Sequence, residues 1–318
     1  MNEQGHKVRL VWQSAALVVL LTSTWLIVGA SLHDASTAIV SAGRTGFTVL
    51  GLLALSWRST LITSSATAER STPAPAPRYQ WWQVVILALT GVTAYTVFST
   101  VAISLAGPAL PALAMSLTPA VVLIAEGVLM RAWPSARTIA GTAIAVVGAV
   151  LYAIPRLAGT LGHDVALGSL VAVAGMLSMA FYGLYFARTN RGYRGAMAPR
   201  ILPIFAVGTI PLTVWASAEI TVGETAGWSA IGMLALLGIV IYVPAYLLQH
   251  RILLVGGPSY SALLGLAVPP LVGVGSATLH LAGAPVPMQL ASMALTLVGM
   301  FLVIRSKLGH AKEGPLRG

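Results

Sequence analysis

Long apolar stretches alternate with short polar segments along almost the whole chain. A helix needs roughly 17–25 apolar residues to cross a hydrocarbon layer of about 30 Å. Ten stretches have about this length, at residues 10–30, 36–56, 82–104, 111–130, 136–154, 167–187, 201–218, 228–248, 259–280 and 288–304. The pattern predicts an all-α integral membrane protein with ten transmembrane helices.

The second half of the chain repeats the first half. Residues 97–122 return in altered form as 247–272, with these matches at a spacing of 150 positions: Gly107-Pro108 with Gly257-Pro258, Pro119 with Pro269, Ala112-Leu113 with Ala262-Leu263, and Val122 with Val272. Because each copy holds five predicted helices, an odd number, the second copy enters the bilayer in the opposite orientation. The sequence therefore predicts two inverted five-helix repeats, residues 1–155 and 156–318.

The connection between the second and third predicted helices differs between the copies. Upstream of it a spacing of 156 positions fits better than 150, and this spacing pairs Arg44 with Arg200. The extra residues fall in 57–81, which contains alternating Ala and Pro and many Ser and Thr residues. This composition predicts a flexible cytoplasmic tether.

The basic residues support ten helices with both termini in the cytoplasm. Every Lys and Arg except Arg44 and Arg156 then falls on the cytoplasmic side, as the positive-inside rule requires. The last residues form a short basic cytoplasmic tail. The pattern places the chain in the plasma or inner membrane as a multi-pass protein.

Composition agrees with this interpretation and narrows the function. Hydrophobic residues make up 57% and charged residues only 8% of the chain, and the mean hydropathy is +0.86. The net charge of +10 follows from the cytoplasmic loops, so we expect no nucleic-acid partner. The chain has no cysteine and no metal-binding motif, so we expect no metal and no cofactor.

Arg44 lies inside the second predicted helix, about 12 Å beyond Ser36. A charge at that depth costs a few kcal/mol unless it is compensated. The guanidinium could reach the outer surface or pair with Asp34, or it could meet a substrate carboxylate in a water-filled cavity. Arg200, close to other arginines, is expected to reach the nearest headgroups.

Glu126 is the only acidic residue inside a predicted helix. It is a candidate for carrying a coupling proton, although a short ion pair with Arg131 would also satisfy it. Pro119, Pro269 and Pro270 must break their helices because proline has no backbone N–H. Such breaks either line a central wet cavity or serve as packing kinks.

Weaker candidates for substrate contact are polar or aromatic residues inside the other helices. They are Trp25, Tyr95, Ser99, Tyr246 and Gln249. Trp25 could equally belong to the interfacial aromatic belt. In the fifth predicted helix Ala140, Gly141, Ala145 and Gly148 form a small-residue face, suited to close helix contact within the chain or in a homodimer.

The combination of ten helices, two five-helix copies, and a Gly-Pro turn followed by a mid-helix proline in each copy resembles the EamA family of the drug/metabolite transporter superfamily. The run Gly-Thr-Ala-Ile-Ala-Val-Val-Gly at 141–148 is similar to the helix that closes each EamA copy. The resemblance implies alternating access and export of amino acids, metabolites or drug-like compounds. Residues 130–132 and 281–283 lack the glutamate that commonly ends the fourth helix of a copy, so no role of that glutamate transfers.

We therefore expect a secondary transporter that exports a small organic metabolite, with a small-molecule substrate and the lipid bilayer as its partners. The alternatives are a membrane-embedded enzyme or a non-transporting channel or assembly protein. An enzyme would need catalytic groups inside the helices, and no such motif is present. A channel or assembly protein would fit the composition but gives no reason for the inverted copies.

Overall fold

The structure is a computed structural model that describes residues 3–32, 34–66, 79–106, 109–130, 133–157, 164–278 and 286–310. These ranges contain no strand. The α-helices are α1 (Glu3–Ser31), α2 (Thr37–Ala66), α3 (Trp81–Leu87), α4 (Tyr95–Ala106), α5 (Ala109–Ser116), α6 (Thr118–Met130), α7 (Ala136–Leu157), α8 (Val165–Thr189), α9 (Met197–Thr221), α10 (Trp228–Ala235), α11 (Val243–Gly256), α12 (Pro258–Leu264), α13 (Val268–Thr278) and α14 (Pro287–His310). The all-α prediction is confirmed for the described residues.

Five helical segments of the described chain are long and apolar enough to cross a membrane: Thr37–Arg58, Trp81–Leu105, Ala166–Thr189, Met197–Thr221 and Trp228–Gly256. Five shorter apolar helices lie at Leu10–Trp25, Ala114–Leu129, Ala136–Tyr152, Pro258–Val272 and Pro287–Val303. Large apolar side chains on the helix surfaces are exposed, among them Trp12 at 72% and Val214 at 65%. An exterior of this kind fits residence in lipid.

The helix that carries Arg44 is longer than the apolar pattern predicts. The predicted tether 57–81 was wrong for its first part, because α2 continues to Ala66. Residues 57–66 contain no glycine or proline, so nothing in them breaks a helix. Residues 67–78 of the tether, Gly107-Pro108, residues 281–283 and the tail 311–318 lie outside the described residues.

Contacts between helices divide the chain into two compact units. The first holds Met1–Thr100 and Tyr185–Val255, and the second holds Val101–Leu184 and Gly256–Gly318. Each unit therefore combines segments from both halves of the sequence. The predicted division into repeats 1–155 and 156–318 is a division of the sequence and stays a prediction.

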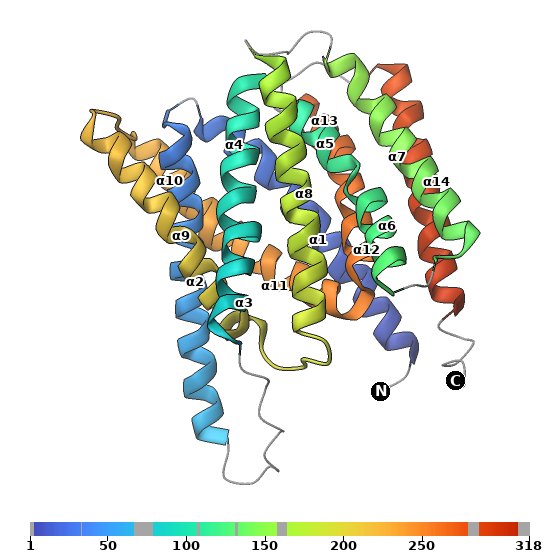
Figure 1. The fold of residues 1–318 in the computed structure, drawn as a ribbon, viewed down its shortest axis with the longest axis horizontal. Coiled ribbons are helices and arrows are strands. Elements are labelled where there is room, and N and C mark those ends of the chain that lie inside the picture. Colours follow the sequence, from blue (N-terminus) through green and yellow to red (C-terminus); the bar gives the residue numbers. More distant parts are fainter. Residues whose placement is uncertain are drawn as a thin grey trace. The chain divides into compact units, whose positions relative to one another are not determined.

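In the first unit α2 packs along α9, as Figure 1 shows in blue and yellow. Each of these helices also packs against a π-helical segment: α2 against η2 (Leu236–Tyr242) and α9 against η1 (Ala88–Ala94). Glycines allow both close approaches. A Cβ on Gly238 would lie 2.9 Å from the Arg44 carbonyl oxygen, and a Cβ on Gly208 would lie 2.9 Å from the Ala88 carbonyl oxygen.

A threonine hydroxyl bridges each of these close contacts. The Thr48 hydroxyl donates to the Gly238 carbonyl oxygen at 3.3 Å, and the Thr93 hydroxyl donates to the Gly208 carbonyl oxygen at 2.7 Å. A π-helical turn leaves carbonyls without their usual partners at i+4, so a donor from a neighbouring helix is useful there. The two π-helical segments are thus held to α2 and α9 by matching contacts.

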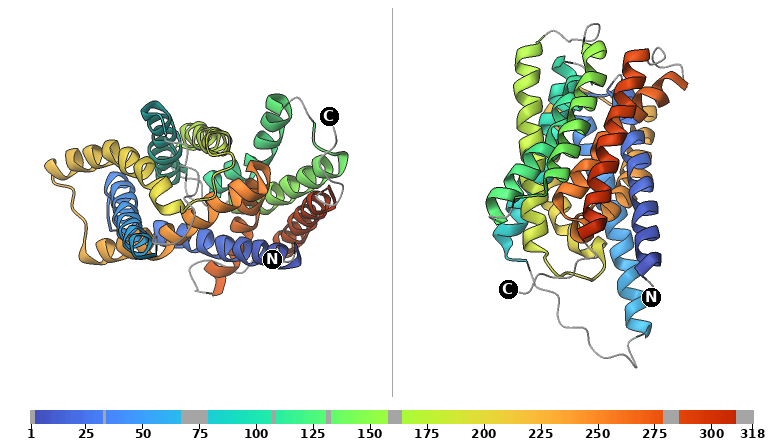
Figure 2. Two further views of the ribbon diagram at one scale, coloured as in Figure 1. Left: turned by 90° about the horizontal axis from the view of Figure 1, so that it is seen from below. Right: turned by 90° about the vertical axis from the view of Figure 1, so that its right-hand side faces the viewer.

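In the second unit α7 and α14 lie side by side along their length, as both Figure 1 and Figure 2 show. The small-residue face of α7 makes this possible. A Cβ on Gly148 would lie 2.6 Å from the Thr296 backbone nitrogen, and Ala145 is fully buried. Gly141, Ala145 and Gly148 are therefore used within the chain, whereas Ala140 at the edge of this face is exposed.

Replacing Gly148 by alanine should destabilise the protein, because the new methyl group collides with the backbone of α14. Overpacking of this kind costs about 1–3 kcal/mol. The midpoint of thermal unfolding of the purified protein in detergent should fall. Gly46→Ala is the matched control, since a Cβ on Gly46 in α2 meets nothing within 4 Å. Equal midpoints for the two variants would contradict this account of the α7–α14 contact.

Candidate functional site

Arg44 is buried in the first unit, where its side chain is only 5% exposed. It lies on α2 two turns from the helix start at Thr37. A buried side chain cannot place its guanidinium among lipid headgroups, so the surface-reaching alternative does not describe it. Arg44 is instead surrounded by polar groups from the helices that pack against α2.

The guanidinium donates hydrogen bonds only to neutral oxygens. Nη1 donates to the Tyr242 hydroxyl at 3.1 Å. Nη2 donates to the Thr100 hydroxyl at 3.2 Å and lies 3.5 Å from both the Ser99 hydroxyl and the Thr96 carbonyl oxygen. Nε has no hydrogen-bond partner among the described residues. Neutral dipoles therefore stabilise the positive charge, and the Nε–H donor lacks an acceptor in the described part of the chain.

Two acidic residues of this unit, Asp34 and Glu219, are engaged elsewhere. The Asp34 carboxylate accepts a hydrogen bond from the Ser229 hydroxyl at 3.2 Å, and the Glu219 carboxylate accepts one from the Ser36 hydroxyl. Among the described residues the charged or ionisable neighbours of Arg44 are tyrosines only, namely Tyr95, Tyr242 and Tyr246. The alternative in which Asp34 neutralises Arg44 is therefore not realised, and the site keeps a net positive charge.

Aromatic rings stand beside this charge. The Arg44 guanidinium carbon lies 5.9 Å from the centre of the Tyr242 ring. The Tyr242 and Tyr246 ring centres are 5.1 Å apart, and the Tyr246 and Phe205 ring centres are 4.6 Å apart. Such rings offer both apolar area and hydroxyl groups. The combination suits a small organic molecule that carries one negative group.

The two π-helical segments place the partners of Arg44. Thr96, Ser99 and Thr100 lie on α4 directly after η1, and Tyr242 is the last residue of η2. A π-helical turn inserts an extra residue into a helix and rotates the side chains that follow, and such turns are frequent at functional sites. Both turns therefore aim polar side chains at the same guanidinium.

The structure brings together Arg44, Tyr95, Ser99 and Tyr246 of the predicted residues. Trp25 on α1 and Gln249 on α11 are half-buried, and neither makes a hydrogen bond to a described residue. Thr96, Thr100, Tyr242 and Phe205 complete the site but were not among the predicted residues. The hydroxyls at 96, 99 and 100 share one helix face, and that spacing was the signal available in the sequence.

The proline breaks lie in the second unit. Pro119 and the pair Pro269 and Pro270 each fall in the first turn of a helix, α6 and α13, where a missing N–H costs little. The break before Pro119 is surrounded by apolar side chains: Met115 and Leu117 pack against Ala114, Ala172 and Met176. These contacts are those of a packing kink.

Glu126 on α6 is half-buried, and its carboxylate accepts a hydrogen bond from the Ser259 hydroxyl at the start of α12. Gly257 precedes this turn with φ of +82°, a conformation that favours glycine. The alternative partner Arg131 lies outside the described residues. The sequence did not point to Ser259.

Arg200 forms a second buried arginine cluster on α9. It is 8% exposed and so does not extend to the headgroups as expected. Its Nε donates to the Asn190 amide oxygen at 2.5 Å, which also accepts from the Tyr79 hydroxyl at 2.8 Å. The Tyr79 ring centre lies 3.5 Å from the Arg200 guanidinium carbon. Burial raises the pKa of Tyr79, so its hydroxyl keeps the proton that it donates.

Among the described residues no three His, Asp or Glu side chains lie close enough to hold a metal ion. The sequence matches no protein-family model and no curated protein. Twenty-nine chains of solved structures match it in structure.

One of these, described only as the crystal structure of a protein, superposes with a TM-score of 0.66 at 17% sequence identity. The superposition covers 93% of this chain and 97% of that chain. The chain therefore shares its fold with that protein. A shared fold at this low sequence identity does not show a shared activity, so function must be argued from the site itself.

Tyr242→Phe should destabilise the protein, because it removes the hydroxyl that accepts from Arg44 Nη1. An unsatisfied buried donor costs about 1–3 kcal/mol. The midpoint of thermal unfolding should fall clearly below that of the wild type. The matched variant Tyr95→Phe removes a hydroxyl that donates no hydrogen bond to a described residue, and it should change the midpoint little. The opposite order of the two midpoints would contradict the assigned geometry.

Proposed function

We propose that this chain is a secondary transporter of the plasma or inner membrane that exports a small organic metabolite by alternating access. The observation that carries the proposal is the Arg44 guanidinium, which is buried with neutral partners only. An uncompensated buried charge costs several kcal/mol, and such charges in membrane helices mark substrate pathways. A substrate carboxylate would supply the missing negative charge and an acceptor for the free Nε.

The inverted repeat is supported by the order of elements. In each half two long helices precede a short helix, a π-helical segment, another helix, a helix broken near a proline, and a final long helix. The π-helical segments η1 and η2 occupy equivalent places in this order. A rare element that recurs in the same place is a specific sign of repetition.

Contacts between equivalent helices also support the repeat. Within the first unit α2 packs with α9, and within the second unit α7 packs with α14. Further, α2 contacts η2 while α9 contacts η1, so each half holds the π-helical segment of the other. Reciprocal contacts of this kind are expected from a two-fold axis that relates the halves.

Two polar contacts repeat in the same reciprocal way. The Tyr79 hydroxyl from the first half donates to Asn190 of the second half, and the Ser229 hydroxyl from the second half donates to Asp34 of the first. At the spacings found in the sequence, Tyr79 is equivalent to Ser229 and Asp34 to Asn190. With ten inverted spans one contact would lie at each side of the membrane.

These features support membership of the EamA family, whose proteins the sequence resembles. On this proposal the chain has ten membrane spans, both termini in the cytoplasm, and a small molecule as its partner. The aromatic side chains of Tyr242, Tyr246 and Phe205 favour a substrate with an apolar body next to its negative group.

Arg44→Ala should abolish transport without reducing the amount of protein in the membrane. The test loads proteoliposomes with a panel of radiolabelled amino acids and organic acids and measures saturable efflux and counterflow. Arg44→Lys keeps the charge but loses the planar fork, so its rate should fall by about tenfold or more. The exposed Arg188→Ala serves as the control and should transport like the wild type.

Equal losses of flux and of folded protein in the Arg44 variants would make Arg44 structural. No saturable flux of any panel member with the wild type, combined with chemical change of a compound, would favour an enzyme.

Glu126→Gln should remove the response of transport to a pH gradient. The amide still accepts the Ser259 hydrogen bond but can carry no coupling proton. Efflux is measured from the same proteoliposomes with and without an imposed gradient. Glu224→Gln, which changes an exposed acid, should keep the full response. A Glu126→Gln variant that responds like the wild type would exclude a coupling role for this carboxylate.

A further inference from the structure

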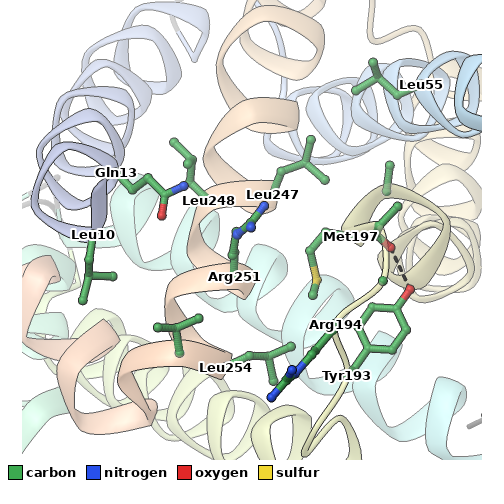
Figure 3. A pocket seen from close by; sticks show the side chains of 14 residues that line it. Leu10, Gln13, Leu55, Tyr193, Arg194, Met197, Leu247, Leu248, Arg251 and Leu254 are labelled. Carbon is green, nitrogen blue, oxygen red and sulfur yellow. Dashed lines mark hydrogen bonds between the residues drawn. The ribbon is translucent and has the colours of Figure 1, made fainter. Parts of the chain in front are cut away.

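A cavity of about 790 Å³ opens in the first unit, away from Arg44 and its partners. Its walls come from α1, α2, the connection between α8 and α9, the start of α9, and α11. The lining includes Arg194, Arg251 and leucines from α1, α2 and α11. Figure 3 shows the lining side chains, with the Arg251 guanidinium pointing toward Leu247 and Leu248 and the Arg194 guanidinium beside Leu254, pointing the other way.

Two arginines give the cavity its charge. Arg194 and Arg251 are both exposed, and neither forms a hydrogen bond or ion pair with a described residue. The lining contains no acidic residue, and its remaining polar side chains are Gln13 and Tyr193. Both guanidinium groups are thus available to an anion, and each offers several donors in a planar fork.

The rest of the lining is apolar, and it reaches the outer surface of the helices. Five leucines border the cavity, and Val255 at its edge is 55% exposed. On α1 the residues next to the cavity, Val11 and Trp12, are 58% and 72% exposed. Exposed apolar side chains on a membrane helix face lipid, so the cavity opens toward acyl chains as well as toward water.

The connection between α8 and α9 is a stable wall of this cavity. The Tyr193 hydroxyl donates to the Ala196 carbonyl oxygen at 2.8 Å, drawn as a dashed line in Figure 3. The Tyr193 ring centre also lies 5.0 Å from the buried Arg200 guanidinium carbon. Arg194 therefore projects from a segment that is fixed on both sides.

We propose that this cavity binds an anionic phospholipid. The headgroup phosphate contacts one of the two arginines, whose guanidinium groups point to different ends of the cavity in Figure 3, and an acyl chain lies against the leucines of α1, α2 and α11. A water-soluble anion would use the arginines but would gain nothing from the apolar walls. A zwitterionic lipid would use the walls, but its own positive group would weaken the attraction to the arginines.

Native mass spectrometry of the detergent-purified protein tests this proposal. The protein is titrated with phosphatidylglycerol and with phosphatidylcholine of identical acyl chains, and the bound fractions are compared. The wild type should bind phosphatidylglycerol more tightly. In the double variant Arg194→Ala/Arg251→Ala the dissociation constant for phosphatidylglycerol should rise by about tenfold or more. Each basic residue near an anionic headgroup strengthens lipid binding electrostatically.

Matched variants distinguish the effect of charge on lipid binding from the effects of residue position and of misfolding. Arg191→Ala removes an exposed arginine of the same connection that does not line the cavity, and it should bind like the wild type. Arg194→Lys/Arg251→Lys keeps both charges and should retain most of the preference. If the double alanine variant does not fold, Arg251→Gln alone is titrated and should show a smaller loss of the same kind.

Three results would overturn the proposal. The first is equal binding of the two lipids by the wild type. The second is an equal loss in Arg191→Ala and in the double alanine variant. The third is displacement of phosphatidylglycerol by glycerol phosphate at the same concentration, which would identify a site for free anions instead. Failure of transport leaves this test unaffected, because binding is measured without a substrate.

Discussion

A buried positive charge without a negative partner is the constraint on which this structure depends. Arg44 is 5% exposed, and its donors meet hydroxyl and carbonyl oxygens only. On the proposed function the site must bind an anion inside a membrane, and a neutral residue could not replace Arg44 there. The residues whose oxygens accept from this group follow or end the two π-helical segments: Thr96, Ser99, Thr100 and Tyr242.

On the proposed repeat Arg44 and Arg200 occupy equivalent positions, and the structure gives them different surroundings. Arg200 is held by Asn190, a neutral side chain that also accepts from Tyr79. At the spacing of 156 positions Asn190 pairs with Asp34, which carries a full negative charge and could have neutralised Arg44. Instead Asp34 is exposed and accepts from Ser229. Arg44 in the first half therefore has no acidic partner among the described residues, whereas Arg200 in the second half is hydrogen-bonded to Asn190.

Much of the fold follows from hydrophobic length and from proline, and little of the site does. Apolar runs predicted the helices, and Pro119 and Pro269 predicted where two of them break. The extension of α2 to Ala66 was missed because the length of an apolar run predicts only the part of a helix inside the lipid. The helix itself continues until a helix-breaking residue such as glycine or proline. Arg44 was singled out by its depth alone, since a charge in a span is costly wherever its partners are.

Ser99 was predicted as a site residue, but Thr96, Thr100 and Tyr242 were not, because the side chains that meet Arg44 depend on helix register. Each π-helical turn adds one residue to a turn of the helix, and no residue type in the sequence predicts where this happens. A strict 3.6-residue period therefore misplaces the side chains after η1, which include Thr96 and Thr100. The burial of Arg200 was missed for a related reason: its partner Tyr79 lies more than a hundred residues away in sequence, within the predicted tether.

The chain contains no cysteine, so a single cysteine at Ser99 gives an unambiguous probe of the space beside Arg44. The most direct measurement is the rate at which this cysteine reacts with anionic and cationic thiosulfonate reagents of similar size. The account predicts faster reaction with the anionic reagent, loss of that preference in Arg44→Gln, and access from each side of the membrane. A cysteine that reacts from neither side, or equally with both reagents, would contradict an anion-binding transport pathway at Arg44.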